Sequence, residues 1–278
     1  MTVWVHGPTS WDSVVELSEF PQPGAFIRAK SKIERPGGSG LNVAYALART
    51  GVEVGFITYL GDDVHGRDLR KFIETLKLKK VIIRDFDVPT LNALIFNDPS
   101  GERTIIALEL TAMNKLDLAQ AKINSGDIFV FTIWRAEYKP MLETLRELGA
   151  LIFVGAKALE DNEVFADIAI GSMRDYLNVE LTSAKKRFGK IVLTDGKNGA
   201  KSFTNSGIHE QQTLATDVVD TTGAGDAFLA GYVYATAQRL SEQDCLFLAS
   251  AWAASAISSK SSLPPTWVEV KKIGRAHV

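Results

Sequence analysis

The sequence has little of several features that mark other classes of protein. It contains one cysteine, Cys245, so no internal disulfide can form, which is typical of a reducing compartment. Its net charge is −2 and no basic stripe runs along it, which argues against a nucleic-acid partner. The four histidines lack paired metal-ligand spacing, which argues against a dedicated zinc site.

Long apolar runs are also absent. No stretch reaches the roughly 18 residues that a membrane span needs, and the first residues lack the basic and apolar regions of a secretory signal. We therefore expect a cytoplasmic protein with no membrane partner. The final KIGRAHV resembles one reading frame of a common sequencing adapter, so we expect a single domain over 1–271 and a non-native tail over 272–278.

Alternating strand and helix patterns predict an α/β fold. Apolar segments such as DIFVFTI and KIVLTDG alternate with amphipathic segments such as KPMLETLREL, which favours a mostly parallel sheet flanked by helices on both faces. GAFIRAKSKIE and the hairpin TLNALIFND-PSG-ERTIIALEL instead alternate apolar and polar residues. We expect a small β-sheet lid from about 14–36 and 90–110, which would cover a substrate cleft or a partner subunit.

The stretch DTTGAGDAF, residues 220–228, carries a chemical signal. A glycine-rich turn that opens a helix leaves backbone N–H groups free and makes an anion site. No lysine follows as in a P-loop, and Phe228 stands where a dinucleotide fingerprint has its third glycine. Asp226 then either caps the helix or acts as the base that deprotonates a hydroxyl in phosphoryl transfer, and the residues alone leave both roles open.

Four segments resemble motifs of the ribokinase-like, or PfkB, carbohydrate kinases. DTTGAGDAF resembles the C-terminal signature of the family and PGGSGLNVAYALARTG its N-terminal signature. TYLGDDVHG resembles its G-x-D-x-x-G segment and TDGKNGA its nucleotide-binding T-x-G-x-x-G turn, in the order of the family. The resemblance implies a ribokinase-like fold and ATP-dependent phosphorylation of a hydroxyl on a small sugar or sugar derivative, with Mg²⁺.

The resemblance also implies the roles of individual residues. Asp226 would be the catalytic base, beside an anion hole made by the backbone N–H groups of Gly223, Ala224 and Gly225. The substrate would be held by Asp12 and Asn42, with Gly37 and Gly38 as the hinge of the lid. The nucleotide site would be lined by Thr194, Gly196, Gly199, Thr222 and Ser172.

The chain departs from the family at two places. IGSMRDY supplies Ser172 and Asp175 where N-x-x-E is common near the metal, so Asp175 would couple to Mg²⁺ indirectly. SSKSSLPP replaces the usual glycine-containing loop near a monovalent cation, whereas Asp220 and Thr222 match cation-loop positions, so activation by K⁺ stays open. These departures are the reason to retain a sugar-binding protein without turnover as an alternative.

Further alternatives concern the substrate and the assembly. A nucleoside kinase of the same fold fits the same motifs. Arg135 follows an apolar strand at the edge where α/β ligands bind, and would pair with an anionic substrate group or form a surface salt bridge. Arg103 in the lid is either solvated or a substrate contact. A half-apolar open sheet needs cover, so we expect a homodimer through the lid.

Overall fold

The computed structural model describes residues 1–97, 103–107, 118–175, 180–259, 261 and 263–270. Its largest element is a nine-stranded sheet in the order β13-β12-β11-β10-β9-β8-β1-β4-β5. All neighbouring pairs from β11 to β5 are parallel, and β12 and β13 add an antiparallel hairpin at one edge. The strands are β1 (Thr2–His6), β4 (Glu53–Gly61), β5 (Lys80–Phe86), β8 (Ile128–Phe131), β9 (Leu151–Gly155), β10 (Ala166–Ser172), β11 (Phe188–Thr194), β12 (Ala200–Thr204) and β13 (Gly207–Gln211).

Helices cover both faces of this sheet, as its apolar strands require. One core joins the sheet to α1 (Ser39–Leu47), α2 (Val64–Glu74), α5 (Ala224–Ala237) and α6 (Glu242–Ile257). A second core on the opposite face includes α3 (Lys139–Glu147) and α4 (Leu181–Ala184). The remaining helical turns are η2 (Ala136–Tyr138), η3 (Ala156–Glu160), η4 (Met173–Asp175) and η5 (Gly196–Asn198). The predicted α/β class and its mostly parallel sheet are confirmed.

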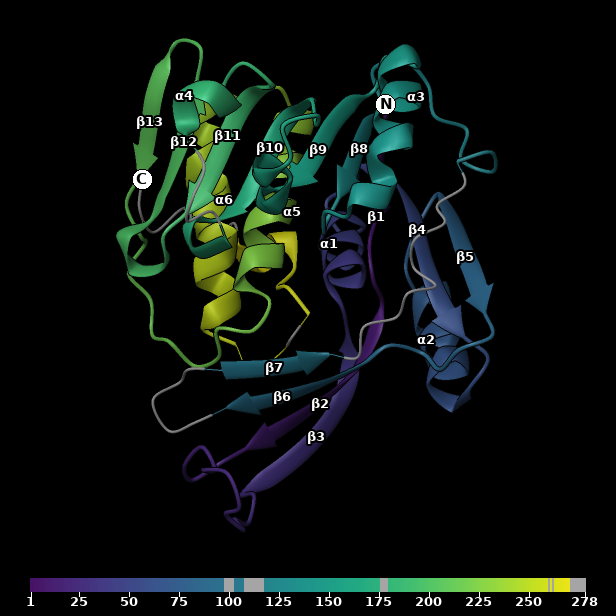
Figure 1. Ribbon diagram of the computed structural model, residues 1–278, viewed down its shortest axis with the longest axis vertical. Coiled ribbons are helices and arrows are strands. Elements are labelled where there is room, and N and C mark those ends of the chain that lie inside the picture. Colours follow the sequence, from purple (N-terminus) through teal and green to yellow (C-terminus); the bar gives the residue numbers. More distant parts are fainter. Residues whose placement is uncertain (98–102, 108–117, 176–179, 260, 262, 271–278) are drawn as a thin grey trace.

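A second sheet of four strands lies across one end of the large sheet (Figure 1). It consists of β2 (Ser10–Glu16), β3 (Ser31–Gly37), β6 (Asn92–Asn97) and β7 (Arg103–Ala107), in the order β3-β2-β6-β7. The predicted lid therefore exists as a separate sheet, but it starts earlier than residue 14. The predicted extended stretch over 24–34 is wrong over 24–30, because the strand begins only at Ser31.

The connections place the small sheet at the carboxyl ends of the parallel strands (Figure 1). β1 runs through a short turn into β2, and β3 runs directly into α1. Ligands of open α/β sheets bind at this edge. In the small sheet Asp12 pairs with Arg35 on one side and Ala93 on the other, so these three side chains share one face. The same alternation puts Val14 and Ile95 on that face, where both are buried.

Candidate active site

The DTTGAGDAF loop turns into a helix as its glycines predict. Gly223 has a φ of 78°, a left-handed conformation that favours glycine, and α5 begins at the next residue. Asp226 lies in the first turn of α5, but no side chain caps this helix. Instead, Oδ2 of Asp226 accepts a hydrogen bond of 2.7 Å from Nδ2 of Asn42 on α1. No hydrogen bond among the described residues therefore supports the alternative in which Asp226 only caps the helix.

Burial raises the pKa of Asp226 to about 6, although the bond from Asn42 and the charge of Arg103 lower it. The nearby charge of Asp12 raises this pKa further. A carboxylate with a pKa close to the working pH is suited to accept a proton in a reaction and to release it afterwards. The fold thus brings Asn42, Asp12 and Arg103, which are far apart in the sequence, close to the carboxylate of Asp226.

Asp12 sits on β2 against a pair of glycines. Its side chain is buried, its Oδ1 accepts a 2.5 Å hydrogen bond from Oγ of Ser10, and burial raises its pKa. A Cβ at Gly37 would lie 2.0 Å from Oδ2 of Asp12, and a Cβ at Gly38 would lie 2.6 Å from the carbonyl oxygen of Pro8. Glycine is therefore required at Gly38, which also has a φ of 95° and whose neighbours are backbone atoms, whereas a side chain at Gly37 would displace the carboxylate of Asp12.

Two arginines of the small sheet reach the same region. Arg35, opposite Asp12, has its Nη2 3.4 Å from Oδ2 of Asp220, just before the glycine loop. Arg103 begins β7, and its buried Nη1 has no hydrogen-bond partner among the described residues. The sequence left the role of Arg103 open and did not single out Arg35. The signal that could have found both is their position on the same face as Asp12, Arg35 on the neighbouring strand β3 and Arg103 two strands away on β7.

A cavity of about 430 Å³ adjoins the glycine loop. Its lining includes the predicted nucleotide residues Thr194, Gly196 and Gly199 together with Ala224 and Gly225, so two segments that resemble kinase motifs meet in space. Its other walls are mostly apolar, as suits a planar heterocycle. They include Leu214, Val218, Phe228, Ala253, Ala254 and Ile257. Sequence reasoning missed all six. For the three on α6 the reason is that an apolar helix has the same pattern whether its side chains meet a core or a ligand.

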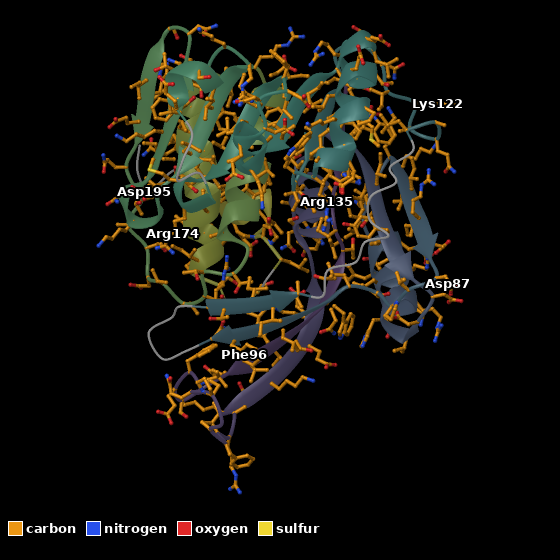
Figure 2. The ribbon with its side chains drawn as sticks, viewed as in Figure 1. Asp87, Phe96, Lys122, Arg135, Arg174 and Asp195 are labelled. Carbon is orange, nitrogen blue, oxygen red and sulfur yellow. The ribbon has the colours of Figure 1, made fainter. Side chains whose placement is uncertain are left out.

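Other predicted residues lie around this cavity without lining it. Ser172 ends β10 and pairs in register with Thr194, and its Oγ accepts a hydrogen bond from the backbone N–H of Arg174. Thr222 is buried in the glycine loop, and its Oγ1 has no partner among the described residues. The side chain of Asp175 falls outside the part of the chain that the structure describes. Figure 2 places Arg174 near β10 and β11, on the same side of the molecule as Asp195.

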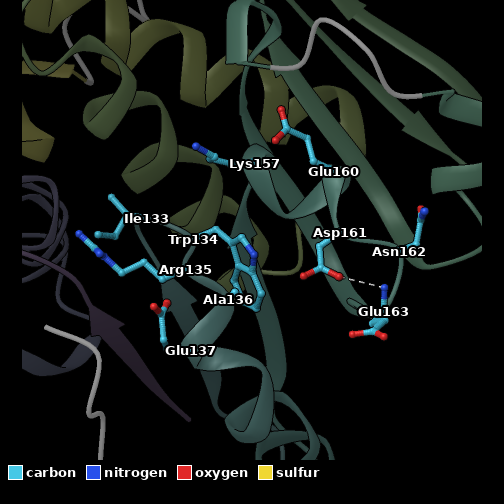
Figure 3. Close-up of a pocket in the computed structure, with 10 residues that line it drawn as sticks. All are labelled: Ile133, Trp134, Arg135, Ala136, Glu137, Lys157, Glu160, Asp161, Asn162 and Glu163. Atoms are coloured by element: carbon cyan, nitrogen blue, oxygen red, sulfur yellow. Dashed lines mark hydrogen bonds between the residues drawn. The ribbon is translucent and has the colours of Figure 1, made fainter. Parts of the chain in front are cut away.

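Arg135 belongs to a second and more open cavity of about 800 Å³ (Figure 3). The segments that follow β8 and β9 line it with charges of both signs, including Lys157 and Glu160. Figure 2 shows Arg135 above the small sheet, at the carboxyl ends of the parallel strands. In the described residues, no group of three or more His, Cys, Asp or Glu side chains is arranged to hold a metal ion. No helix within the described ranges is long and apolar enough to cross a bilayer.

Comparison with known proteins shows the family to which this chain belongs. The family model described as pfkB family carbohydrate kinase matches residues 10–133 and 114–268. An ATP-dependent ribose-1-phosphate kinase of Halopiger xanaduensis is 26% identical over 243 residues, which are 82% of each chain. An aminoimidazole riboside kinase of Salmonella typhimurium is 27% identical over 284 residues, covering 90% of this chain and 85% of that protein.

Solved structures of similar shape agree on the fold. Ribokinase from Thermotoga maritima superposes with a TM-score of 0.81 at 20% identity, covering 99% of both chains. A nucleoside kinase of Burkholderia thailandensis, solved in complex with inosine, gives a TM-score of 0.82 at 18% identity, covering 99% of this chain and 98% of that one. At these identities the likeness establishes the ribokinase-like fold.

Proposed function

Because the chain belongs to the pfkB family of carbohydrate kinases, we propose that it transfers the γ-phosphoryl group of ATP to a hydroxyl of a small sugar or sugar derivative. One observation carries the assignment of the reacting group. Asp226, with a pKa raised to about 6, directly follows Gly225, which lines the 430 Å³ cavity, and its carboxylate accepts a hydrogen bond from Asn42 and senses the charge of Asp12.

The acceptor hydroxyl would be oriented by Asp12 and Asn42 and deprotonated by Asp226. A bond forms between the acceptor oxygen and the γ-phosphorus, while the bond from that phosphorus to the β–γ bridging oxygen breaks and ADP leaves. The proton of the hydroxyl ends on the carboxylate of Asp226. The raised pKa of this group supports the role, since the carboxylate is both available near neutral pH and basic enough to accept the proton.

ATP would lie with its base in the apolar part of the 430 Å³ cavity and its phosphates toward the start of α5. The N–H groups of Gly223, Ala224 and Gly225 would then face the charge that develops on the transferred group. Thr194, Gly196 and Gly199 line the same cavity, and Thr222 and Ser172 would contact the phosphates from nearby. A set of three protein carboxylates is not needed here, because Mg²⁺ in kinases is bound largely by phosphates and water.

The metal and the lid complete this proposal. Mg²⁺ would neutralise charge on the phosphates, and Asp175 would reach it through water. Closure of the small sheet on the hinge at Gly37 and Gly38 would exclude water, which otherwise competes as the acceptor. Arg135 would pair with an anionic substituent of the acceptor. K⁺ stays a prediction at Asp220, although the contact of that carboxylate with Arg35 does not favour it.

A nucleoside is the second candidate acceptor, and an apolar row in the small sheet favours it. Ile33, Val14, Ile95 and Ile105 stand side by side across the four strands, on the face that carries Asp12. Ile33 and Ile105 are half exposed. A purine or another apolar substituent packed against these side chains would gain free energy from burial. A sugar without such a substituent would leave the isoleucine side chains exposed to solvent.

The same exposed side chains motivate the proposed homodimer. If no substituent covers Ile33 and Ile105, a second copy of the small sheet would do so. A monomeric mass in light scattering at micromolar concentration would contradict this assembly. Residence in the cytoplasm also belongs to the proposal, and the single cysteine is the feature that supports it.

The test is ADP release from Mg-ATP across a panel of ketoses, aldoses, sugar acids, polyols and nucleosides. A strong response to a sugar alone supports the first acceptor class, and a response to nucleosides alone supports the second. ATP binding by calorimetry is measured in parallel. Binding of sugar without ADP release would contradict the kinase reaction and favour a binding protein, while absence of ATP binding would overturn the nucleotide site.

A further inference from the structure

The loop before the anion hole is held by an arginine of the lid. Oδ2 of Asp220 lies 3.4 Å from Nη2 of Arg35, and Oδ1 of the same carboxylate accepts a 2.8 Å hydrogen bond from the backbone N–H of Thr222. Both oxygens of Asp220 are therefore engaged within the chain. A monovalent cation at this carboxylate would stand close to the guanidinium and be repelled by it, so the residues present do not fit a K⁺ site.

We propose that Arg35 takes the place of a monovalent cation at Asp220 and latches the small sheet to the loop that forms the anion hole. The inference rests on the proposed kinase function, because it concerns how the phosphate-binding loop is organised. It makes nucleotide binding by this chain independent of K⁺, a question that the sequence left open.

Burial makes the latch effective. The side chains of Arg35 and Asp220 are 13% and 12% exposed, so salt and water screen their attraction less than that of a surface pair. Arg35 lies on β3 directly opposite Asp12 and two residues before the hinge glycine Gly37. The ion pair therefore joins the base of the lid to the main sheet domain, beside the position proposed for the acceptor.

The loop is fixed from two sides. The backbone N–H groups of Val219 and Asp220 both donate to the carbonyl oxygen of Ile257 at the end of α6, at 2.8 and 3.1 Å. On its other side Asp220 is held by Arg35, and its Oδ1 in turn fixes the backbone N–H of Thr222. The left-handed turn at Gly223 follows at once. A change in the charge of Arg35 is therefore passed to the N–H groups that would meet the phosphates.

The lid arginine also acts on the acceptor side. The charge of Arg35 lowers the pKa of Asp12, against the effect of burial. One guanidinium thus favours the ionised form of the carboxylate proposed to bind the acceptor, and neutralises the carboxylate that shapes the anion hole. A mobile cation bound at the loop alone would serve the second purpose only.

The experiment measures binding of a non-hydrolysable Mg-ATP analogue by calorimetry, in KCl and in tetramethylammonium chloride at equal ionic strength. The wild-type chain should bind with the same affinity in both salts. Arg35→Ala should bind about tenfold more weakly in tetramethylammonium, because the largely buried carboxylate of Asp220 loses its partner, and KCl should restore part of the loss. Arg35→Lys should keep most of the affinity in both salts.

Lys32→Ala is the matched control. Lys32 lies on the same strand and pairs with Glu34 in solvent, so its removal changes the net charge equally without touching the loop. This variant should bind the analogue like the wild-type chain in both salts. Thermal unfolding of each variant by circular dichroism checks that a loss of affinity does not reflect a loss of fold.

A second readout needs no nucleotide. Hydrogen exchange of the backbone amides over 217–224 should be faster in Arg35→Ala than in the wild-type chain, and KCl should slow it again. Affinity of the wild-type chain that rises with KCl would overturn the proposal, as would an Arg35→Ala chain that matches the wild type in exchange. If no chain binds the analogue, the kinase function fails, while the exchange rates still decide whether the latch exists.

Discussion

Replacement of Asp226 by asparagine separates the chemical role of this carboxylate from its effect on stability. Burial moves its pKa from 3.8 to about 6, a rise of about 2 units, and each unit corresponds to about 1.4 kcal/mol. The ionised carboxylate therefore costs the folded state up to about 3 kcal/mol relative to the unfolded chain. Asparagine can still accept the bond from Nδ2 of Asn42 through its amide oxygen, but it does not ionise.

The sign of the pH dependence follows from these two pKa values. The folded chain holds the proton of Asp226 more tightly than the unfolded chain, so stability is lost as pH rises from 3.8 to about 6 and stays low above that range. Asp226→Asn should be more stable than the wild type by up to about 3 kcal/mol near pH 8. The difference should shrink as pH falls below about 6 and vanish below about 3.8.

Turnover should change in the opposite direction. Loss of a general base lowers kcat by about 10²- to 10⁴-fold, while affinity for ATP should be nearly unchanged. The assays are urea unfolding as a function of pH, ADP release with the acceptor identified from the panel, and calorimetry of ATP. Asp87→Asn, which removes an exposed carboxylate in a loop of the same chain, should leave both stability and turnover unaltered.

Two outcomes would refute this reasoning. Wild-type turnover in Asp226→Asn would show that the carboxylate does not take the proton. A variant that is no more stable than the wild type near pH 8 would show that Asp226 is not held in a costly ionised state. The combination of lower activity and higher stability is typical of a residue kept for chemistry rather than for folding.

Three further predictions test the surroundings of this carboxylate. kcat/KM for the acceptor should fall as pH drops below about 6. Arg103→Gln should move this acidic limb of the pH profile to higher pH, because the guanidinium lowers the pKa of Asp226. An unmoved limb would contradict this electrostatic effect. Gly37→Ala should raise KM for the acceptor by about tenfold or more, because the new Cβ would displace the carboxylate of Asp12. ATP affinity should be retained. Unchanged steady-state kinetics would exclude that clash. A Cβ at Gly225 would meet nothing within 4 Å in the described part of the chain, so Gly225→Ala should keep the melting temperature of the wild type. Its affinity for ATP should fall about tenfold, because the methyl group would stand where the phosphates approach the helix start. Full affinity in calorimetry would place the phosphates elsewhere.

Part of the fold could be predicted from the sequence because its signals are local. The apolar strands that alternate with amphipathic helices indicated the parallel sheet with helices on both faces, since each strand must bury two faces. The small sheet was predicted from alternation in the 90–110 hairpin. β2 was missed in its first half, because WDSVVE buries residues on both faces and lacks strict alternation.

The sequence by itself determined the conformation of the glycine loop. The left-handed turn at Gly223, the helix that follows, and the carboxylate in its first turn are all set within nine residues. The tertiary structure decided what meets that loop. Asn42 reaches Asp226 across 184 positions and Arg35 reaches Asp220 across 185. Such contacts depend on strand order and on the register of the small sheet, which local preferences do not encode, and so the partner of each carboxylate appears only when the chain is folded.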